Sequence, residues 1–288
     1  MSMQEKLSSG DFLILAEIEP PKGVDFTEAM AHAARVRGQV DAFVVPEMSN
    51  AVMKMSSLGG CALLQSVGLE TVMQVCCRDR NRLALQADLL AAGAIGISNV
   101  IAVTGVEPSF GDHSRARSVH DIDLLQLLEA IQKLKSGRDM AGIALNGAPT
   151  FCVGSTANAG VSGERLDPEL EEVKRKVAVG VEFFITPPVF ELQSLTKFMN
   201  RAEVRKARII PTVLLLKSVG MARYIDQHLA DVHVPGDLIT RIQKAPDKVR
   251  ECVRIAREQV AAIKEMGYGG VLISTIGWED KLSSIVEG

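Results

Sequence analysis

The sequence predicts a parallel α/β protein, and two observations favour a closed, single (β/α)8 TIM barrel. Short apolar or β-branched runs alternate eight times with longer amphipathic stretches, the pattern of parallel strands joined by helices. Residues 100–103 (VIAV) are apolar throughout, as expected of a strand covered on both faces. Eight such repeats in 288 residues suit a barrel, with a doubly wound open sheet as the alternative.

Each predicted strand coincides with an apolar or β-branched run, and each predicted helix with an amphipathic stretch. The expected strands are residues 12–18, 41–46, 70–76, 99–105, 149–154, 182–186, 208–215 and 269–275. The expected helices are residues 26–38, 51–66, 80–94, 121–136, 167–179, 190–205, 217–229 and 246–266. No linker or change in composition divides the chain, so residues 1–288 are expected to form one domain.

Three of these helices carry clear local signals. Residues 80–94 place leucines among alanines, which are the strongest helix formers. Residues 167–179 begin with Asp167 and Pro168, a pair typical of an N-cap and a first helical turn. Residues 246–266 carry an apolar stripe at helical spacing.

Composition excludes several classes of protein. The 32 basic and 35 acidic side chains leave a net charge of −3, and aromatic residues make up only 4%. A polybasic arm or a base-stacking surface is therefore absent, and no nucleic-acid partner is expected. The apolar runs are too short for a signal peptide or a membrane span. We expect a cytoplasmic protein that does not enter the membrane and that forms an oligomer.

The sequence gives no signal for a metal or for the common nucleotide-binding loops. The five cysteines are scattered, without a Cys-x-x-Cys pair, and His113 has no second ligand nearby at metal spacing. Neither a G-x-G-x-x-G turn after the first strand nor a P-loop occurs. We therefore expect no metal site.

Chemistry in a (β/α)8 barrel takes place at the carboxyl ends of the strands. Alternation along the first strand puts Glu17 and Glu19 on one face, together with Leu13 and Leu15. If that face points inward, desolvation and like-charge repulsion raise the pKa of at least one carboxyl, which makes a usable general acid. The alternative is that both glutamates end an exposed edge and face solvent.

Other strand ends give weaker signals. Gly105 and Gly154 leave room for a flat or phosphorylated ligand to approach the backbone, although loops of barrels often contain glycine. Residues 78–82 (RDRNR) are most simply a capped helix start with solvated charges.

The order of motifs resembles the methylenetetrahydrofolate reductase family along nearly the whole chain, from about residue 12 to 286. The matching motifs are Glu17-Ile18-Glu19-Pro20-Pro21, Cys77-Arg78-Asp79-Arg80-Asn81, Val103-Thr104-Gly105, Phe110-Gly111-Asp112-His113, Lys174-Arg175-Lys176, Phe184-Ile185-Thr186 and Gly277-Trp278-Glu279. The closing motifs are similar to those of short, barrel-only members of anaerobic one-carbon pathways.

The resemblance implies a flavoprotein that reduces 5,10-methylenetetrahydrofolate to 5-methyltetrahydrofolate. In this family, protonation at N10 opens the imidazolidine ring to a 5-iminium cation, and reduced flavin then delivers hydride from N5. The family's acid aligns with Glu17. The flavin contacts, to FAD or FMN, align with Gln74, Thr104, Gly105, Gly154, Thr156, Glu169 and Lys176. The folate substrate is expected to meet Glu19 and Thr186.

Three positions depart from the family pattern. Val106 replaces an aspartate beside the flavin, where Glu107 is a candidate substitute, and Trp278 replaces an arginine that meets the folate tail. Pro187 replaces a glutamine that contacts substrate and nicotinamide. These departures point to a partner subunit that relays electrons. They leave two alternatives open, a non-catalytic flavoprotein electron-transfer subunit and a folate-binding methyltransferase barrel.

Overall fold

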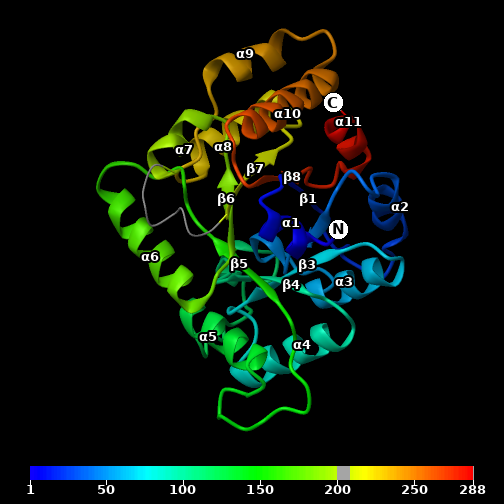
Figure 1. Cartoon of the computed structure of the whole chain (residues 1–288). Coiled ribbons are helices and arrows are strands. Elements are labelled where there is room, and N and C mark those ends of the chain that lie inside the picture. Colours follow the sequence, from blue (N-terminus) through cyan, green and yellow to red (C-terminus); the bar gives the residue numbers. More distant parts are fainter. Residues whose placement is uncertain (200–207, 288) are drawn as a thin grey trace.

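A closed barrel of parallel strands forms the centre of the molecule. The computed structural model describes residues 1–199 and 208–287. Neighbouring strands pair in parallel in the order β1 to β8, and β8 pairs with β1 to close the barrel (Figure 1). The strands are β1 (Leu13–Glu17), β2 (Ala42–Val45), β3 (Thr71–Cys76), β4 (Asn99–Val103), β5 (Cys152–Thr156), β6 (Phe183–Pro188), β7 (Arg208–Leu214) and β8 (Gly270–Ser274). The predicted (β/α)8 barrel is confirmed, and the open sheet is wrong.

Helices surround the barrel (Figure 1). They are α1 (Met3–Ser9), α2 (Thr27–Arg35), α3 (Ser57–Ser66), α4 (Arg82–Ala94), α5 (Leu124–Lys135), α6 (Leu166–Val179), α7 (Leu192–Met199), α8 (Val219–His228), α9 (Gly236–Lys244), α10 (Lys248–Glu265) and α11 (Leu282–Val286). Short 3-10 turns precede or follow some of them: η1 (Ser49–Ala51), η2 (Pro108–Phe110), η3 (Gly163–Arg165) and η5 (Glu279–Lys281).

Every predicted strand and helix has a counterpart, but several boundaries differ. The helix expected at 51–66 begins only at Ser57, because η1 and an extended segment come first. The strand expected at 149–154 runs from Cys152 to Thr156. Asp167 lies in the first turn of α6 and is not its N-cap, which is Arg165. Beyond residue 199, the helix expected at 190–205 lies outside the described residues.

Helices α1, α9 and α11 were not predicted from the sequence. Helix α1 closes the amino-terminal end of the barrel, where Met3 is fully buried and its backbone N–H donates to the Glu70 carboxylate at 3.0 Å. Helix α9 follows α8 within the connection from β7 to α10 (Figure 1). Because α1 covers the amino-terminal end, the opposite end of the barrel is left for ligands.

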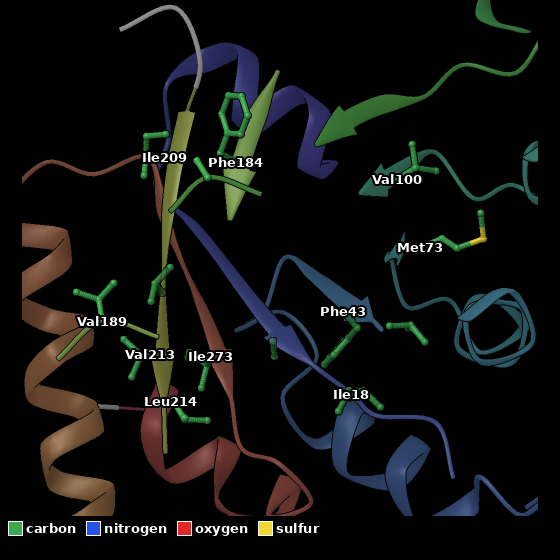
Figure 2. Close-up of a cluster of buried hydrophobic side chains, with 14 of the residues drawn as sticks. Ile18, Phe43, Met73, Val100, Phe184, Val189, Ile209, Val213, Leu214 and Ile273 are labelled. Atoms are coloured by element: carbon green, nitrogen blue, oxygen red, sulfur yellow. The ribbon is translucent and has the colours of Figure 1, made fainter. Parts of the chain in front are cut away.

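Two apolar layers hold the barrel together. Inward-facing side chains such as Leu15, Phe183 and Leu272 fill its interior. A larger outer layer lies between the strands and the helices, and Figure 2 shows Phe43 and Val213 among its members. Strand residues alternate between these two layers, which fixes the side chains that reach the carboxyl-terminal mouth.

The described residues lack two kinds of feature, a membrane-spanning helix and a metal-binding cluster. None of the helices in the described ranges is long and apolar enough to cross a membrane. Within the same ranges, there is no cluster of three or more histidine, cysteine, aspartate or glutamate side chains that could hold a metal ion.

Candidate active site

Glu17 lies at the mouth of the barrel, at the end of β1. Leu13 and Leu15 of the same strand belong to the interior layer, so alternation turns Glu17 inward above them. The hydroxyl of Ser274, at the end of β8, donates a hydrogen bond of 2.7 Å to Oε1 of Glu17. Closure of the barrel between β1 and β8 therefore brings together two residues that are 257 positions apart in the sequence.

The pKa of Glu17 is raised to about 7. Desolvation by burial is the main cause, and the neighbouring charge of Glu19 adds to it. The hydrogen bond from Ser274 and the positive charge of Lys54 act in the opposite direction. A carboxyl with this pKa is substantially protonated at neutral pH, so the predicted rise in the pKa of one of the two glutamates is confirmed for Glu17.

Glu19 lies beyond the end of β1 and has a different environment. Its carboxylate forms an ion pair with Lys54, which comes from the segment between η1 and α3. Both side chains are about one-fifth exposed, at 18% and 20%. We call Glu17, Glu19, Lys54 and Ser274 the acid side of the mouth.

Across the mouth, Thr104, Thr156 and Lys176 line one pocket of about 610 Å³ between β4, β5, α5 and α6. Lys176 is only 5% exposed, and its ammonium donates to the Thr156 carbonyl at 3.0 Å. Burial lowers the pKa of Lys176, and Glu172, whose carboxylate is 3.9 Å away, opposes that shift. We call Thr104, Thr156 and Lys176 the pocket side.

Glu169 and Gln74 each accept a hydrogen bond from a backbone N–H. Glu169 accepts a hydrogen bond of 2.8 Å from the N–H of Asn158, in the loop after β5. Gln74, on β3, accepts one of 2.8 Å from the N–H of Glu47 through Oε1. That hydrogen bond assigns the amide orientation and leaves the Nε2 donors of Gln74 for another partner.

The structure gives the two candidate glycines packing reasons of their own. A Cβ on Gly154 would lie 2.3 Å from the ring of Phe183, inside the barrel. Gly105 has φ +92°, and a Cβ there would lie 2.3 Å from Sγ of Cys76. Both positions therefore require glycine even without a ligand, and their contact with flavin stays a prediction.

The environment of Arg78 differs most from the one predicted from the sequence. In place of a solvated charge, its side chain is 2% exposed and donates to Asp79 at 2.7 and 2.6 Å. It also donates to the carbonyl of Val106 at 2.9 Å and so supports the loop after β4. Asn81, in contrast, caps α4 as expected, since its side chain accepts from Leu83 and Ala84.

Glu107 and Thr186 have their polar atoms engaged locally. The Glu107 carboxylate accepts from Ser118 at 2.7 Å and lies 3.1 Å from the ring of His120, so it serves its own loop. The hydroxyl of Thr186 donates to the carbonyl of Pro187 at 2.7 Å. That Glu107 substitutes for the aspartate of the family stays a prediction.

Asp112, in the loop after β4, contacts the loops that follow β1 and β2. It pairs with Lys22 of the loop after β1 and with His113, and it accepts from the N–H of Met53 at 2.9 Å. A Cβ on Gly111 would lie 1.8 Å from the carbonyl oxygen of Ala51, so glycine is required there. These contacts order the segment that carries Lys54.

The barrel fold is shared with solved structures of other proteins. The chain resembles EDTA monooxygenase from Chelativorans sp. BNC1 at 12% identity and a TM-score of 0.59, over 96% of this chain and 92% of that one. It also resembles 2,3-dimethylmalate lyase, a member of the PEP mutase/isocitrate lyase superfamily, at 7% identity and a TM-score of 0.56, over 99% and 82%. Such low identities show a shared fold alone.

The family is shown by a different comparison. The family model described as methylenetetrahydrofolate reductase matches residues 2–288, essentially the whole chain. That match agrees with the order of motifs along the sequence. The protein therefore belongs to the methylenetetrahydrofolate reductase family of oxidoreductases.

Proposed function

We propose that this protein reduces 5,10-methylenetetrahydrofolate to 5-methyltetrahydrofolate with a bound flavin, FAD or FMN. The observation that carries the proposal is Glu17, an inward carboxyl at the barrel mouth with a pKa of about 7. An acid of that strength matches proton transfer at neutral pH. Family membership supplies the reaction in which such an acid is required.

The pocket side fits a flavin nucleotide. A pocket of about 610 Å³ lies within the range of cofactor sites, and Thr104 and Thr156 are among the residues that line it. Lys176 uses one donor on the Thr156 carbonyl and has two left, which suits a phosphate. Thr104, Gly105, Thr156 and Lys176 would hold the cofactor with Gln74, Gly154 and Glu169, and the flavin would supply the hydride.

The acid side performs the proton chemistry. Ser274 occupies Oε1 of Glu17, so the carboxyl proton is carried by Oε2. Glu17 gives this proton to N10 of the folate, the bond between N10 and the methylene carbon breaks, and the five-membered ring opens. Lys54 keeps Glu19 paired, so the substrate meets one protonated carboxyl and one neutralised carboxylate.

The test is the visible spectrum of the purified protein, followed by anaerobic reoxidation of its reduced flavin by methylenetetrahydrofolate. We expect bound flavin and rapid reoxidation with one methyl product per flavin. A colourless protein that cannot be loaded with flavin contradicts the proposal and favours the methyltransferase barrel. If the protein binds flavin but the folate does not reoxidise it, the proposal is contradicted. That outcome favours the electron-transfer subunit.

We further propose that a partner subunit supplies the electrons. Val106 brings no charge to the loop after β4, and Pro187 has no side-chain amide to orient a nicotinamide ring. Stopped-flow mixing of the lone chain with NADH or NADPH should therefore bleach the flavin far more slowly than dithionite-reduced enzyme transfers hydride to the folate. Bleaching by either nicotinamide at the rate of folate turnover contradicts the need for a partner.

A further inference from the structure

Helix α4 is apolar on both of its faces. Its inner face packs Leu85, Leu89 and Ala92 against the barrel, and all three side chains are buried. On the opposite face, Leu83 is 75% exposed and Leu90 is 37% exposed. A helix that is apolar all round is normally buried, whereas the outer face of α4 meets solvent in the single chain.

The outer faces of other helices carry charges. Helix α10 exposes a row of arginines at helical spacing, Arg250, Arg254 and Arg257. In contrast, α4 contains only two charged residues, and each has a partner outside the helix. Arg82 pairs with Asp121, and Asp88 pairs with Arg80, both at 2.8 Å. The outer face of α4 is therefore not a solvated, charged face of the usual kind.

The apolar surface continues from α4 onto its neighbours. Figure 1 shows α4 on the outside of the barrel, with α3 and α5 next to it. Val67, the C-cap of α3, is exposed. Ile143, in the loop after α5, is exposed too, and the N–H of Met140 joins this loop to α4 by donating to Gln86 at 2.7 Å. Contiguous exposed patches of this kind mark sites of contact with other molecules.

Four exposed residues of α4 form a line along the helix, Leu83, Ala87, Leu90 and Ala94, which we call the α4 stripe. Successive members are four, three and four residues apart, the spacing of a contact between two helices. This spacing is the same in both directions. When a second α4 is laid antiparallel, Leu83 of each copy therefore meets Ala94 of the other, and Ala87 meets Leu90. Large side chains then lie over small ones, so the helices can approach closely.

Charge favours the same antiparallel arrangement. It brings the amino-terminal end of each helix, with Arg82, next to the carboxyl-terminal end of the other, whose last carbonyls carry partial negative charge. A parallel pair would instead place the two Arg82 side chains together. The 13 residues of α4, the end of α3 and the loop after α5 also supply the roughly 20–30 residues that one side of a standard interface contains.

We propose that the α4 stripe is the contact between two copies of this chain, related by a two-fold axis that passes the middle of α4. A second copy is favoured over a different partner, because the stripe is complementary to itself, as a two-fold interface requires. The inference uses neither the flavin pocket nor the acid side of the mouth. It therefore stands or falls separately from the proposed function.

The first test is the mass of the flavin-loaded chain in solution, measured by light scattering at micromolar concentration. We expect twice the 31.0 kDa of one chain. Leu90→Glu puts a carboxylate into the apolar contact and should raise the dissociation constant of the dimer by about 10²-fold or more. Leu83→Glu should act in the same direction, and its exposed position spares the core of the monomer. Val249→Glu, which changes an exposed apolar residue of α10, is the matched control and should leave the dimer intact.

The second test is disulfide formation between variant chains, which reports the antiparallel register. A mixture of Ala87→Cys and Leu90→Cys chains should form a disulfide between unlike chains on mild oxidation, and the buried native cysteines should not compete. A mixture of Leu83→Cys and Leu90→Cys chains is the control, because Leu90 lies one helical turn from the Ala94 that faces Leu83.

Three results would overturn the inference. The first is a wild-type chain that is monomeric at micromolar concentration. The second is a dimer that both Leu83→Glu and Leu90→Glu leave intact. The third is a dimer in which the Ala87→Cys and Leu90→Cys chains form no more disulfide than the control mixture.

Discussion

The acid side and the pocket side of the mouth are built differently. On the acid side each carboxyl already has a partner, Ser274 for Glu17 and Lys54 for Glu19. On the pocket side a cavity of about 610 Å³ remains, and the Lys176 ammonium has made only part of its possible contacts. The acid side is thus ready to act on a substrate, whereas the pocket side is completed by a ligand.

This difference follows from what each side has to do. A general acid needs a fixed, partly dehydrated position, because burial is what raises its pKa. A cofactor site needs space and unused donors, because the cofactor brings its own charge and shape. Changes on the acid side should therefore remove chemistry and spare cofactor binding, and changes on the pocket side should do the reverse.

The largest expected effect comes from Glu17→Gln. The amide keeps the shape of the side chain and cannot donate a carboxylic proton, so folate turnover should fall by about 10²–10⁴-fold. Flavin content and reduction by dithionite should stay unchanged. Glu19→Gln is the comparison, and we expect it to cost much less. Turnover in Glu17→Gln that equals the wild type would show that the acid is elsewhere.

The same substitution should stabilise the protein at high pH. The pKa of Glu17 is about 7 in the folded protein against 4.5 for the ordinary group, so the folded state binds the proton more tightly. Protonation of Glu17 therefore contributes fully to the free energy of unfolding below about pH 4.5, and this contribution is lost as the pH rises through 7. From pH 5 to pH 8, urea unfolding should show Glu17→Gln gaining about 2–3 kcal/mol relative to the wild type.

Glu28→Gln controls for this stability prediction, because its carboxyl is 92% exposed on α2. It should show no comparable change between the two pH values. If Glu17→Gln and Glu28→Gln have the same pH dependence, Glu17 does not have a raised pKa in the folded protein.

On the pocket side, Lys176→Ala should weaken flavin binding without altering the acid. One charge-assisted hydrogen bond contributes about 1.5–3 kcal/mol, or roughly 10–150-fold in affinity. The dissociation constant of the flavin measures the effect, and turnover at saturating flavin should be largely retained. Lys174→Ala is the control, since Lys174 lies on the outer face of the same helix and is 61% exposed. Equal flavin affinity in both variants would remove Lys176 from the site.

Features of the site that depend on local sequence could be predicted. Alternation along one strand is local, so the inward position of Glu17 could be predicted from five residues of β1. Helix α1 had a local signal too, because Ser2 and Glu5 form a capping box. The helix is short and mostly polar, so it lacks the apolar periodicity from which the other helices were predicted.

What could not be predicted depends on contacts between distant segments. Ser274 reaches Glu17 only because β8 closes the barrel against β1. Arg78 is buried because the loop after β4 folds over it and offers the Val106 carbonyl, and a run of charges gives no hint of that. Gly154 is required by the ring of Phe183, from the neighbouring strand, and not by anything in its own segment.

The smallest expected effect concerns Ser274, and it tests whether barrel closure tunes the acid. The Ser274 hydroxyl stabilises the ionised form of Glu17 and so lowers its pKa. Removing it in Ser274→Ala should raise that pKa further, by an interaction worth about 0.5–1.5 kcal/mol. A larger fraction of the enzyme is then protonated above neutral pH. The alkaline limb of kcat/KM for the folate should move to higher pH, while flavin affinity stays constant.

Glu17→Gln and the double variant should both lack this limb, because the group that titrates is gone. A limb that stays in place in Ser274→Ala, or moves to lower pH, would mean that the hydroxyl orients Glu17 without setting its proton affinity.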